Sequence, residues 1–158
     1  MKTIVTRISI TIFTIICLSC SNDDNTDMTT TTIEFSPEQI NGVWRISFFS
    51  DENGERTSEF NAYQFVFNLT GSDTGDVSII SNGNTVTDGF DLFEETNDNV
   101  ETWILELTMH ENPGDADLFD LNEDWIITRV NDDVTYIEFE EQDSNNSPEI
   151  LHLIKLEN

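Results

Sequence analysis

The chain has 158 residues, of which 32 are Asp or Glu and only 6 are Lys or Arg, so its formal net charge is −26. That length suits a single domain. The charge makes nucleic acid a poor partner, because phosphate binding needs clustered Lys and Arg. The chain also contains 11 Phe, 3 Trp and 2 Tyr, an aromatic content that argues against a disordered protein.

Residues 1–19 predict a signal peptide. Lys2 and Arg7 make its start positive, and the apolar stretch 8–18 is shorter than the roughly 20 residues that a membrane-spanning helix needs. Leu18-Ser19-Cys20 resembles a bacterial lipobox, whose cysteine becomes the lipidated N-terminus. We therefore expect lipid attachment at Cys20; an ordinary signal peptide that is cleaved elsewhere is the alternative.

Residues 20–35 predict a polar tether between the lipid and the domain. The acidic stretch 21–27 at its start resembles the export signal of surface lipoproteins of the Bacteroidetes. This resemblance implies an exported outer-membrane lipoprotein that is exposed on the cell surface. An acidic tether that only keeps the domain away from an anionic membrane is the alternative.

Both cysteines, Cys17 and Cys20, precede the predicted domain, which comprises residues 36–158. The domain therefore has no disulfide, no thiolate metal site and no cysteine nucleophile. Its stability must come from an apolar core.

A short helix begins the predicted domain, with Ser36 as N-cap, Pro37 at the first helical position and Gln39 completing a capping box. Beyond Asn41-Gly42, apolar and polar residues alternate with the period of β-strands. The eight predicted strands, of which the fourth has the weakest pattern, are 43–49, 62–69, 76–81, 85–92, 101–109, 124–130, 134–140 and 150–156.

Short turns join most of these strands, and Asn82-Gly83 is a strong signal for a type I′ hairpin. Two connections are longer, 50–61 and 110–123, and the second predicts a helical turn near Leu118–Leu121. Eight strands joined in sequence predict an all-β fold, an eight-stranded up-and-down antiparallel barrel. A two-sheet β-sandwich is the alternative.

The short helix followed by Gly42-Val43-Trp44-Arg45 resembles the start of lipocalins and lipocalin-like barrels, whose signature is Gly-x-Trp. The stretches 60–67 and 121–125 and the terminal Leu153-Ile154-Lys155-Leu156 are similar to small lipocalin-like lipoproteins of Flavobacteria. The chain lacks the middle-loop motif of true lipocalins and a clear Arg in its last strand. Over residues 36–158, the resemblance implies that Trp44 plugs the closed end of the barrel beneath Lys155 or Arg129.

Aromatic side chains on the alternating strands are the feature most compatible with ligand binding. We expect a pocket for a small apolar or amphipathic ligand, lined by Phe48, Tyr63, Phe65, Phe67 and Trp103. An eight-stranded barrel either is filled by its own side chains or holds one small ligand. A filled barrel that contacts an envelope protein or an inhibitor target through 50–61 and 110–123 therefore stays the alternative.

We expect neither an enzyme nor a cofactor. The two histidines, His110 and His152, stand in no ligand spacing, and no nucleophile motif is present. We also expect no metal site. Asp115, Asp117 and Asp120 form a weak calcium candidate, but their spacing does not match an EF-hand. The expected partners are a lipid membrane through the acylated Cys20, a small hydrophobic ligand and an envelope protein.

Overall fold

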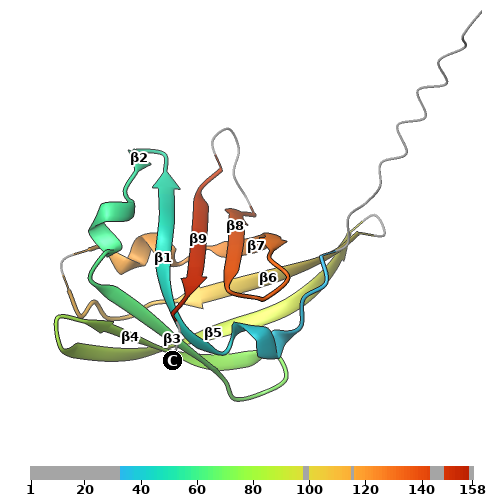
Figure 1. The fold of residues 1–158 in the computed structure, drawn as a ribbon, viewed down its shortest axis with the longest axis horizontal. Helices are drawn as coiled ribbons and strands as arrows, with labels where there is room; N and C mark the ends of the chain where they lie inside the picture. Colours follow the sequence, from blue (N-terminus) through green and yellow to red (C-terminus); the bar gives the residue numbers. More distant parts are fainter. Residues whose placement is uncertain (1–32, 98–99, 115, 143–147, 157–158) are drawn as a thin grey trace, which may run out of the picture.

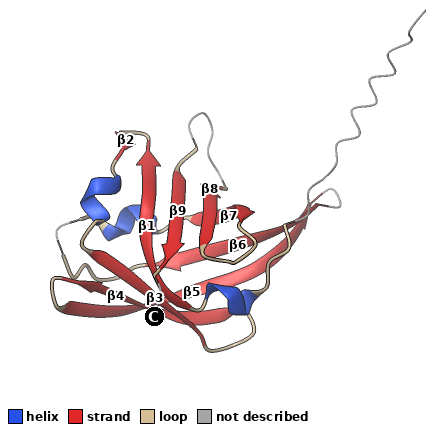
Figure 2. Cartoon of the chain, viewed as in Figure 1, coloured by secondary structure: helices blue, strands red, loops and turns tan. Residues whose placement is uncertain are grey.

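The computed structural model describes residues 33–97, 100–114, 116–142 and 148–156 (Figure 1). Strands dominate this part of the chain, and its helices are single turns of 3₁₀ helix (Figure 2). The elements are η1 (Pro37–Ile40), β1 (Gly42–Asp51), β2 (Gly54–Glu55), η2 (Thr57–Phe60), β3 (Tyr63–Leu69), β4 (Thr74–Ser81), β5 (Asn84–Asn97), β6 (Val100–Thr108), η3 (Leu118–Leu121), β7 (Asp124–Val130), β8 (Tyr136–Glu141) and β9 (Ile150–Lys155). None of the described helices is long and apolar enough to cross a membrane.

The strands form one antiparallel sheet in the order β2-β1-β3-β4-β5-β6-β7-β8-β9, and pairing of β9 with β1 closes it. Eight strands make the barrel, and β2 is an extra strand that pairs with the end of β1. The predicted all-β class, up-and-down order and eight strands are confirmed. The alternative of two packed sheets is wrong, because every pair of neighbouring strands around the barrel is hydrogen-bonded.

The turn at Asn82-Gly83 has φ angles of 51° and 82°, the positive values that a type I′ turn requires. This turn is followed directly by β5, for which the sequence predicts the shorter strand 85–92 from a weak pattern. The strand instead runs to Asn97 and pairs with β6 along its whole second half. The sequence pattern misses 93–97 because the core-facing alternation ends at Leu92, whereas the backbone hydrogen bonds continue.

The η1 turn covers one end of the barrel, where β1 begins. The backbone N–H of Ser36 donates to Gln39 Oε1 at 2.7 Å, and the backbone N–H of Leu69 donates to Asn41 Oδ1 at 2.6 Å. Phe35, which the sequence places in the tether, is buried, and its ring centroid lies 5.9 Å from that of Trp103. The packed part of the chain therefore includes the end of the predicted tether.

The opposite end of the barrel is covered by the two long connections, 50–61 and 110–123. Phe60 from η2 and Leu118 from η3 are fully buried there. The Arg56 guanidinium joins the two connections, since Nη1 lies 2.5 Å from Asp51 Oδ2 and 2.6 Å from Asp120 Oδ2. The backbone N–H of Ala116 also donates to Tyr63 Oη at 2.9 Å.

The barrel interior is filled by large side chains. The largest of those that are completely buried are Trp44, Trp125, Phe49, Phe60, Phe65 and Phe139. Phe49 contacts two of the others edge to face, with ring centroids 5.1 Å from Phe60 and 6.4 Å from Trp125. With this interior and both ends covered, the described side chains occupy the space in which a hollow barrel would hold its ligand.

Candidate functional site

Three of the five predicted pocket residues, Tyr63, Phe65 and Phe67, point into the interior and are at most 3% exposed. They pack against other aromatic rings and not around a space: Phe67, for example, lies 5.3 Å from Phe90 between ring centroids. Trp103 is half-buried at the η1 end of the barrel, against Phe35. The structure thus does not bring the five side chains together around one pocket.

The prediction that Phe48 faces inward is wrong. The register between β1 and β9 shifts between Ile46 and Phe48, which marks a β-bulge. One extra residue reverses the alternation, so Phe49 is completely buried while Phe48 lies outside. There its ring contacts His152, with 5.0 Å between the centroids.

The two histidines lie in different surroundings. His152 is half-buried, its Nδ1 is within hydrogen-bond distance of Tyr136 Oη at 3.0 Å, and burial lowers its pKa below the usual range. His110 is exposed, and its Nδ1 lies 3.1 Å from Asp88 Oδ1. His110 thus contacts a carboxylate at the surface, and His152 contacts a phenol hydroxyl; the two histidines do not share a site.

Lys155 is the cation over Trp44. Its Nζ lies 4.9 Å from the centroid of the indole and donates to the Gln39 carbonyl oxygen at 3.3 Å. Burial lowers the pKa of Lys155. Arg129, the other predicted cation, is exposed and pairs with Glu138 at 3.1 Å.

Of the weak calcium candidates, Asp115 lies outside the described residues. Asp117 Oδ1 accepts a hydrogen bond from the backbone N–H of Phe119 and caps η3. Asp120 pairs with Arg56. Among the residues that the structure describes, no three acidic or histidine side chains are arranged to hold a metal ion.

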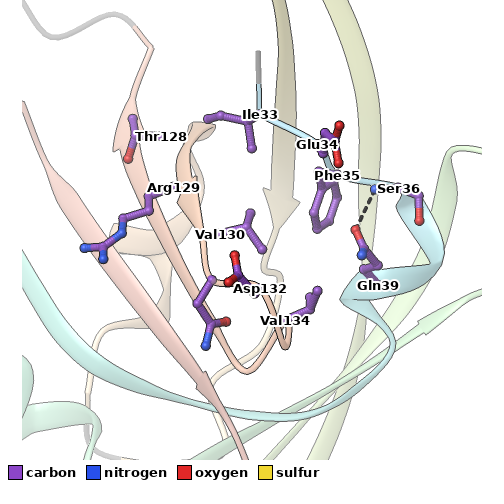
Figure 3. Close-up of a pocket in the computed structure, with 11 residues that line it drawn as sticks. Ile33, Glu34, Phe35, Ser36, Gln39, Thr128, Arg129, Val130, Asp132 and Val134 are labelled. Atoms are coloured by element: carbon purple, nitrogen blue, oxygen red, sulfur yellow. Dashed lines mark hydrogen bonds between the residues drawn. The ribbon is translucent and has the colours of Figure 1, made fainter. Parts of the chain in front are cut away.

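A groove of about 810 Å³ lies at the η1 end of the barrel, between residues 33–39 and the β7–β8 hairpin (Figure 3). Its lining comprises Ile33, Glu34, Phe35, Ser36, Gln39, Thr128, Arg129, Val130, Asn131, Asp132 and Val134. The groove is the candidate functional site of the described chain.

The groove has apolar walls and a polar rim. Ile33 and Phe35 project from one side, and Val130 and Val134 from the other (Figure 3). The rim bears the carboxylates of Glu34 and Asp132.

Arg129 adds little positive charge to this rim. Its guanidinium points away from the groove in Figure 3 and is paired with Glu138. Among the residues that line the groove, the charges left outside an ion pair are therefore those of Glu34 and Asp132. This arrangement suits a ligand with an apolar body and a cationic or neutral polar head.

Val134 adopts a positive φ of 50°, which is strained for a β-branched residue and costs about 1–2 kcal/mol. Hydrogen bonds around Asn131 hold this conformation: its Oδ1 accepts from the backbone N–H groups of Thr135 at 2.8 Å and Tyr136 at 2.9 Å. Its carbonyl accepts from the Val134 N–H at 2.9 Å. An apolar valine side chain therefore lies at the groove wall, at a turn position where Gly or Asn would be typical.

The sequence gives no direct prediction of this groove, because 33–35 are assigned to the tether and 131–133 to a plain turn. A signal is nevertheless present: Ile33 and Phe35 are apolar at alternate positions directly before the predicted N-cap. Such a pair is typical of a segment that packs against the domain.

No family model, no curated protein and no solved structure matches this chain. Its function must therefore be argued from the chemistry of its own surfaces.

Proposed function

We propose that this protein is an exported lipoprotein, anchored to the outer membrane through an acylated Cys20, whose filled barrel binds a small amphipathic ligand in the groove at its η1 end. The binding is not catalytic. The observation that carries the proposal is the groove, whose apolar walls lie between two segments at the surface of an otherwise filled barrel.

Burial of apolar area drives this binding. Each CH₂ group that leaves water contributes about 0.8 kcal/mol, so each added CH₂ tightens the Kd about fourfold until the groove is full. The acidic rim then discriminates between head groups. We expect an alkylamine to bind more tightly than the alcohol of equal length, and the alcohol more tightly than the carboxylate.

The position of the groove suits a ligand that comes from the membrane. Ile33, at its wall, is separated from Cys20 by residues 21–32, which as a random coil span roughly 20 Å. A lipid on Cys20 would therefore hold the groove near the bilayer surface. The acidic domain, residues 36–158, has no basic patch to do so, because it contains 4 Lys and Arg residues against 28 acids.

Trp103 provides the experiment. It is half-buried and contacts Phe35 of the groove wall, whereas Trp44 and Trp125 are completely buried. Titration with decylamine, decanol and decanoate, each below its micelle concentration, should change the Trp103 emission saturably and in that order of affinity. The Trp103→Phe variant should lose the signal. Flat titrations with all three compounds contradict the proposal.

A second candidate function is a protein-interaction or inhibitor module of the cell envelope. The filled interior favours it, and so does the rigid link that Arg56 forms between 50–61 and 110–123. Flat titrations of Trp103 together with a partner that protects these two loops from proteolysis would select this candidate over ligand binding.

The anchor has a separate test. Cys20→Ala should give an unprocessed or soluble form in place of a membrane-bound one. Normal membrane fractionation of this variant contradicts lipid attachment at Cys20 and leaves the binding experiment unaffected.

A further inference from the structure

An apolar row lies on the outside of the barrel, on the face of β5, β6 and β7 that points away from the core. Phe93 is directly opposite Ile104, which in turn is directly opposite Ile126. Phe93 is 36% exposed, and Ile104 is buried although it lies outside the core cluster. Sheet alternation confirms this orientation. Leu92 precedes Phe93 and Leu105 follows Ile104, and both leucines face the interior.

The same face carries a second exposed apolar residue. Val100 lies four positions before Ile104 on β6, so both side chains point outward, and it is 38% exposed. Within the described residues, three large apolar side chains are exposed, Phe93, Val100 and Phe119, and two of them belong to this face.

A row of carboxylates runs beside the apolar row. On each of the three strands, the acidic residue lies two positions away from the apolar one. Asp91 is directly opposite Glu106, and Glu106 directly opposite Asp124. Like charges in directly opposed positions destabilise a sheet. In the part of the chain that the structure describes, no hydrogen bond or ion pair engages these three side chains.

We infer that this outer face of β5, β6 and β7 is a docking surface for a cationic amphipathic segment of another protein. Lysine or arginine side chains would neutralise the carboxylate row, and apolar side chains would cover Phe93 and its neighbours. A second copy of this chain does not fit, because two molecules of charge −26 would bring carboxylates against carboxylates.

The spacing of the two rows suits such a segment. Positions two residues apart on a strand are about 6.8 Å apart, and three neighbouring strands span about 10 Å. Residues i and i+2 of an extended peptide point to the same side and are also about 6.8 Å apart, so a strand laid along β6 can place a cationic side chain on one row and an apolar side chain on the other. The surface shares no residue with the groove, so it does not depend on the function proposed above.

The test uses the full chain and three synthetic peptides of equal length. Their repeats are Lys-Ser-Leu-Ser (the Lys–Leu peptide), Lys-Ser-Ser-Ser (the Lys–Ser peptide) and Glu-Ser-Leu-Ser, so that Lys and Leu of an extended chain point to the same side. Only the Lys–Leu peptide should bind saturably at physiological salt, and more weakly as salt rises. The variant D91N/E106Q/D124N should weaken this binding about tenfold or more, and Phe93→Ser should do the same.

Matched controls lie elsewhere on the surface. Asp76 is exposed on β4 opposite Asn68 and Gly89, with no carboxylate across from it, so Asp76→Asn should change the Kd less than about twofold. Phe119→Ser removes an aromatic ring from η3 that is more exposed than Phe93, 49% against 36%, and should also leave binding unchanged.

A stability measurement completes the test. Glu106→Gln removes the carboxylate that has acidic neighbours on both sides, so it should raise the Tm, whereas Asp76→Asn should not. The inference is overturned if the Lys–Leu peptide does not bind, if the triple variant binds it as tightly as the wild type, or if the Lys–Ser peptide binds equally well. A Tm lowered by Glu106→Gln also overturns it, because the carboxylate would then stabilise the fold.

Discussion

Trp44 and Trp125 make the same hydrogen bond at opposite ends of the barrel. The indole N–H of Trp44 donates to the Ile40 carbonyl at 2.6 Å, and that of Trp125 donates to the Leu121 carbonyl at 3.0 Å. Each carbonyl belongs to the last residue of a 3₁₀ turn, four residues before the tryptophan. The same local arrangement of a 3₁₀ turn and a tryptophan therefore closes each end of the barrel.

This arrangement also includes an asparagine directly after each turn. Asn41 Oδ1 accepts from the Leu69 N–H, and Asn122 holds the backbone of Met109, whose carbonyl accepts from Asn122 Nδ2 at 3.0 Å. Each asparagine thus ties its turn to a neighbouring strand. The sequence pattern is an aliphatic residue, Asn, two further residues and Trp, at 40–44 and again at 121–125.

Truncation of either tryptophan should destabilise the protein strongly. Both side chains are completely buried, and Trp44→Ala or Trp125→Ala should each cost about 3–5 kcal/mol of unfolding free energy. Urea denaturation measures this cost, and Trp→Phe variants, which keep most of the ring, should lose less. A Trp44→Ala variant with an unchanged melting temperature would show that Trp44 is not a plug.

Replacement of Arg56 by Met should loosen the end of the barrel opposite η1. Hydrogen bonds from Arg56 and Asn53 overcome the effect of burial and hold the pKa of Asp51 below its usual range. Without the guanidinium, the buried Asp51 carboxylate loses its cation, at a cost of about 2 kcal/mol. Hydrogen exchange should quicken in 50–61 and 110–123 together. Faster exchange in only one of them would contradict a shared link.

Glu149→Gln should change how stability depends on pH. Burial raises the pKa of Glu149 to about 7, with the charges of Glu141 and Asp51 adding to the effect. Because this value lies above the ordinary 4.5, the folded state holds the proton more tightly than the unfolded state. The group's stabilising contribution is therefore full below about pH 4.5 and is lost as the pH rises through about 7.

The variant Glu149→Gln should lack this decline and should exceed the wild type in stability at about pH 8. Glu101→Gln, at an exposed position on β6, removes the same charge and serves as the control. Thermal unfolding across this pH range gives the comparison. Parallel curves for the wild type and Glu149→Gln would contradict the raised pKa.

Val134→Asn should change stability and ligand affinity in opposite directions. Asn adopts a positive φ readily, so Val134→Asn should raise stability by up to about 1 kcal/mol. The same change replaces an apolar groove wall by an amide, so it should weaken decylamine binding several-fold. A variant that is both less stable and unchanged in binding would contradict the assignment of Val134 to a strained binding wall.

Most of the fold could be predicted from the sequence because strand alternation, the Asn82-Gly83 turn and short connections are local signals. Phe48 could not be placed correctly, since the bulge before it depends on pairing with β9, which is distant in the sequence. The whole length of β5 was also hidden, because its second half is held by hydrogen bonds to β6 and not by core burial.

The groove was harder to predict than the barrel for a related reason. Its walls come from 33–39 and the β7–β8 hairpin, which are brought together only when the barrel closes. A cation over Trp44 was expected only from the resemblance to lipocalins, and the pairing of β1 with β9 brings Lys155 to that position. The choice between Lys155 and Arg129 needed the register, in which Trp44 is directly opposite Lys155.

The central claim is that ligand binds in the groove at the η1 end of a filled barrel and not in its interior, and NMR mapping of backbone amides during a decylamine titration tests it most directly. We predict saturable shifts that cluster in residues 33–39 and 128–134, with the amides around Phe65, Ile79 and Leu92 unchanged. Shifts centred on those interior residues, or no saturable shifts at all, would contradict it.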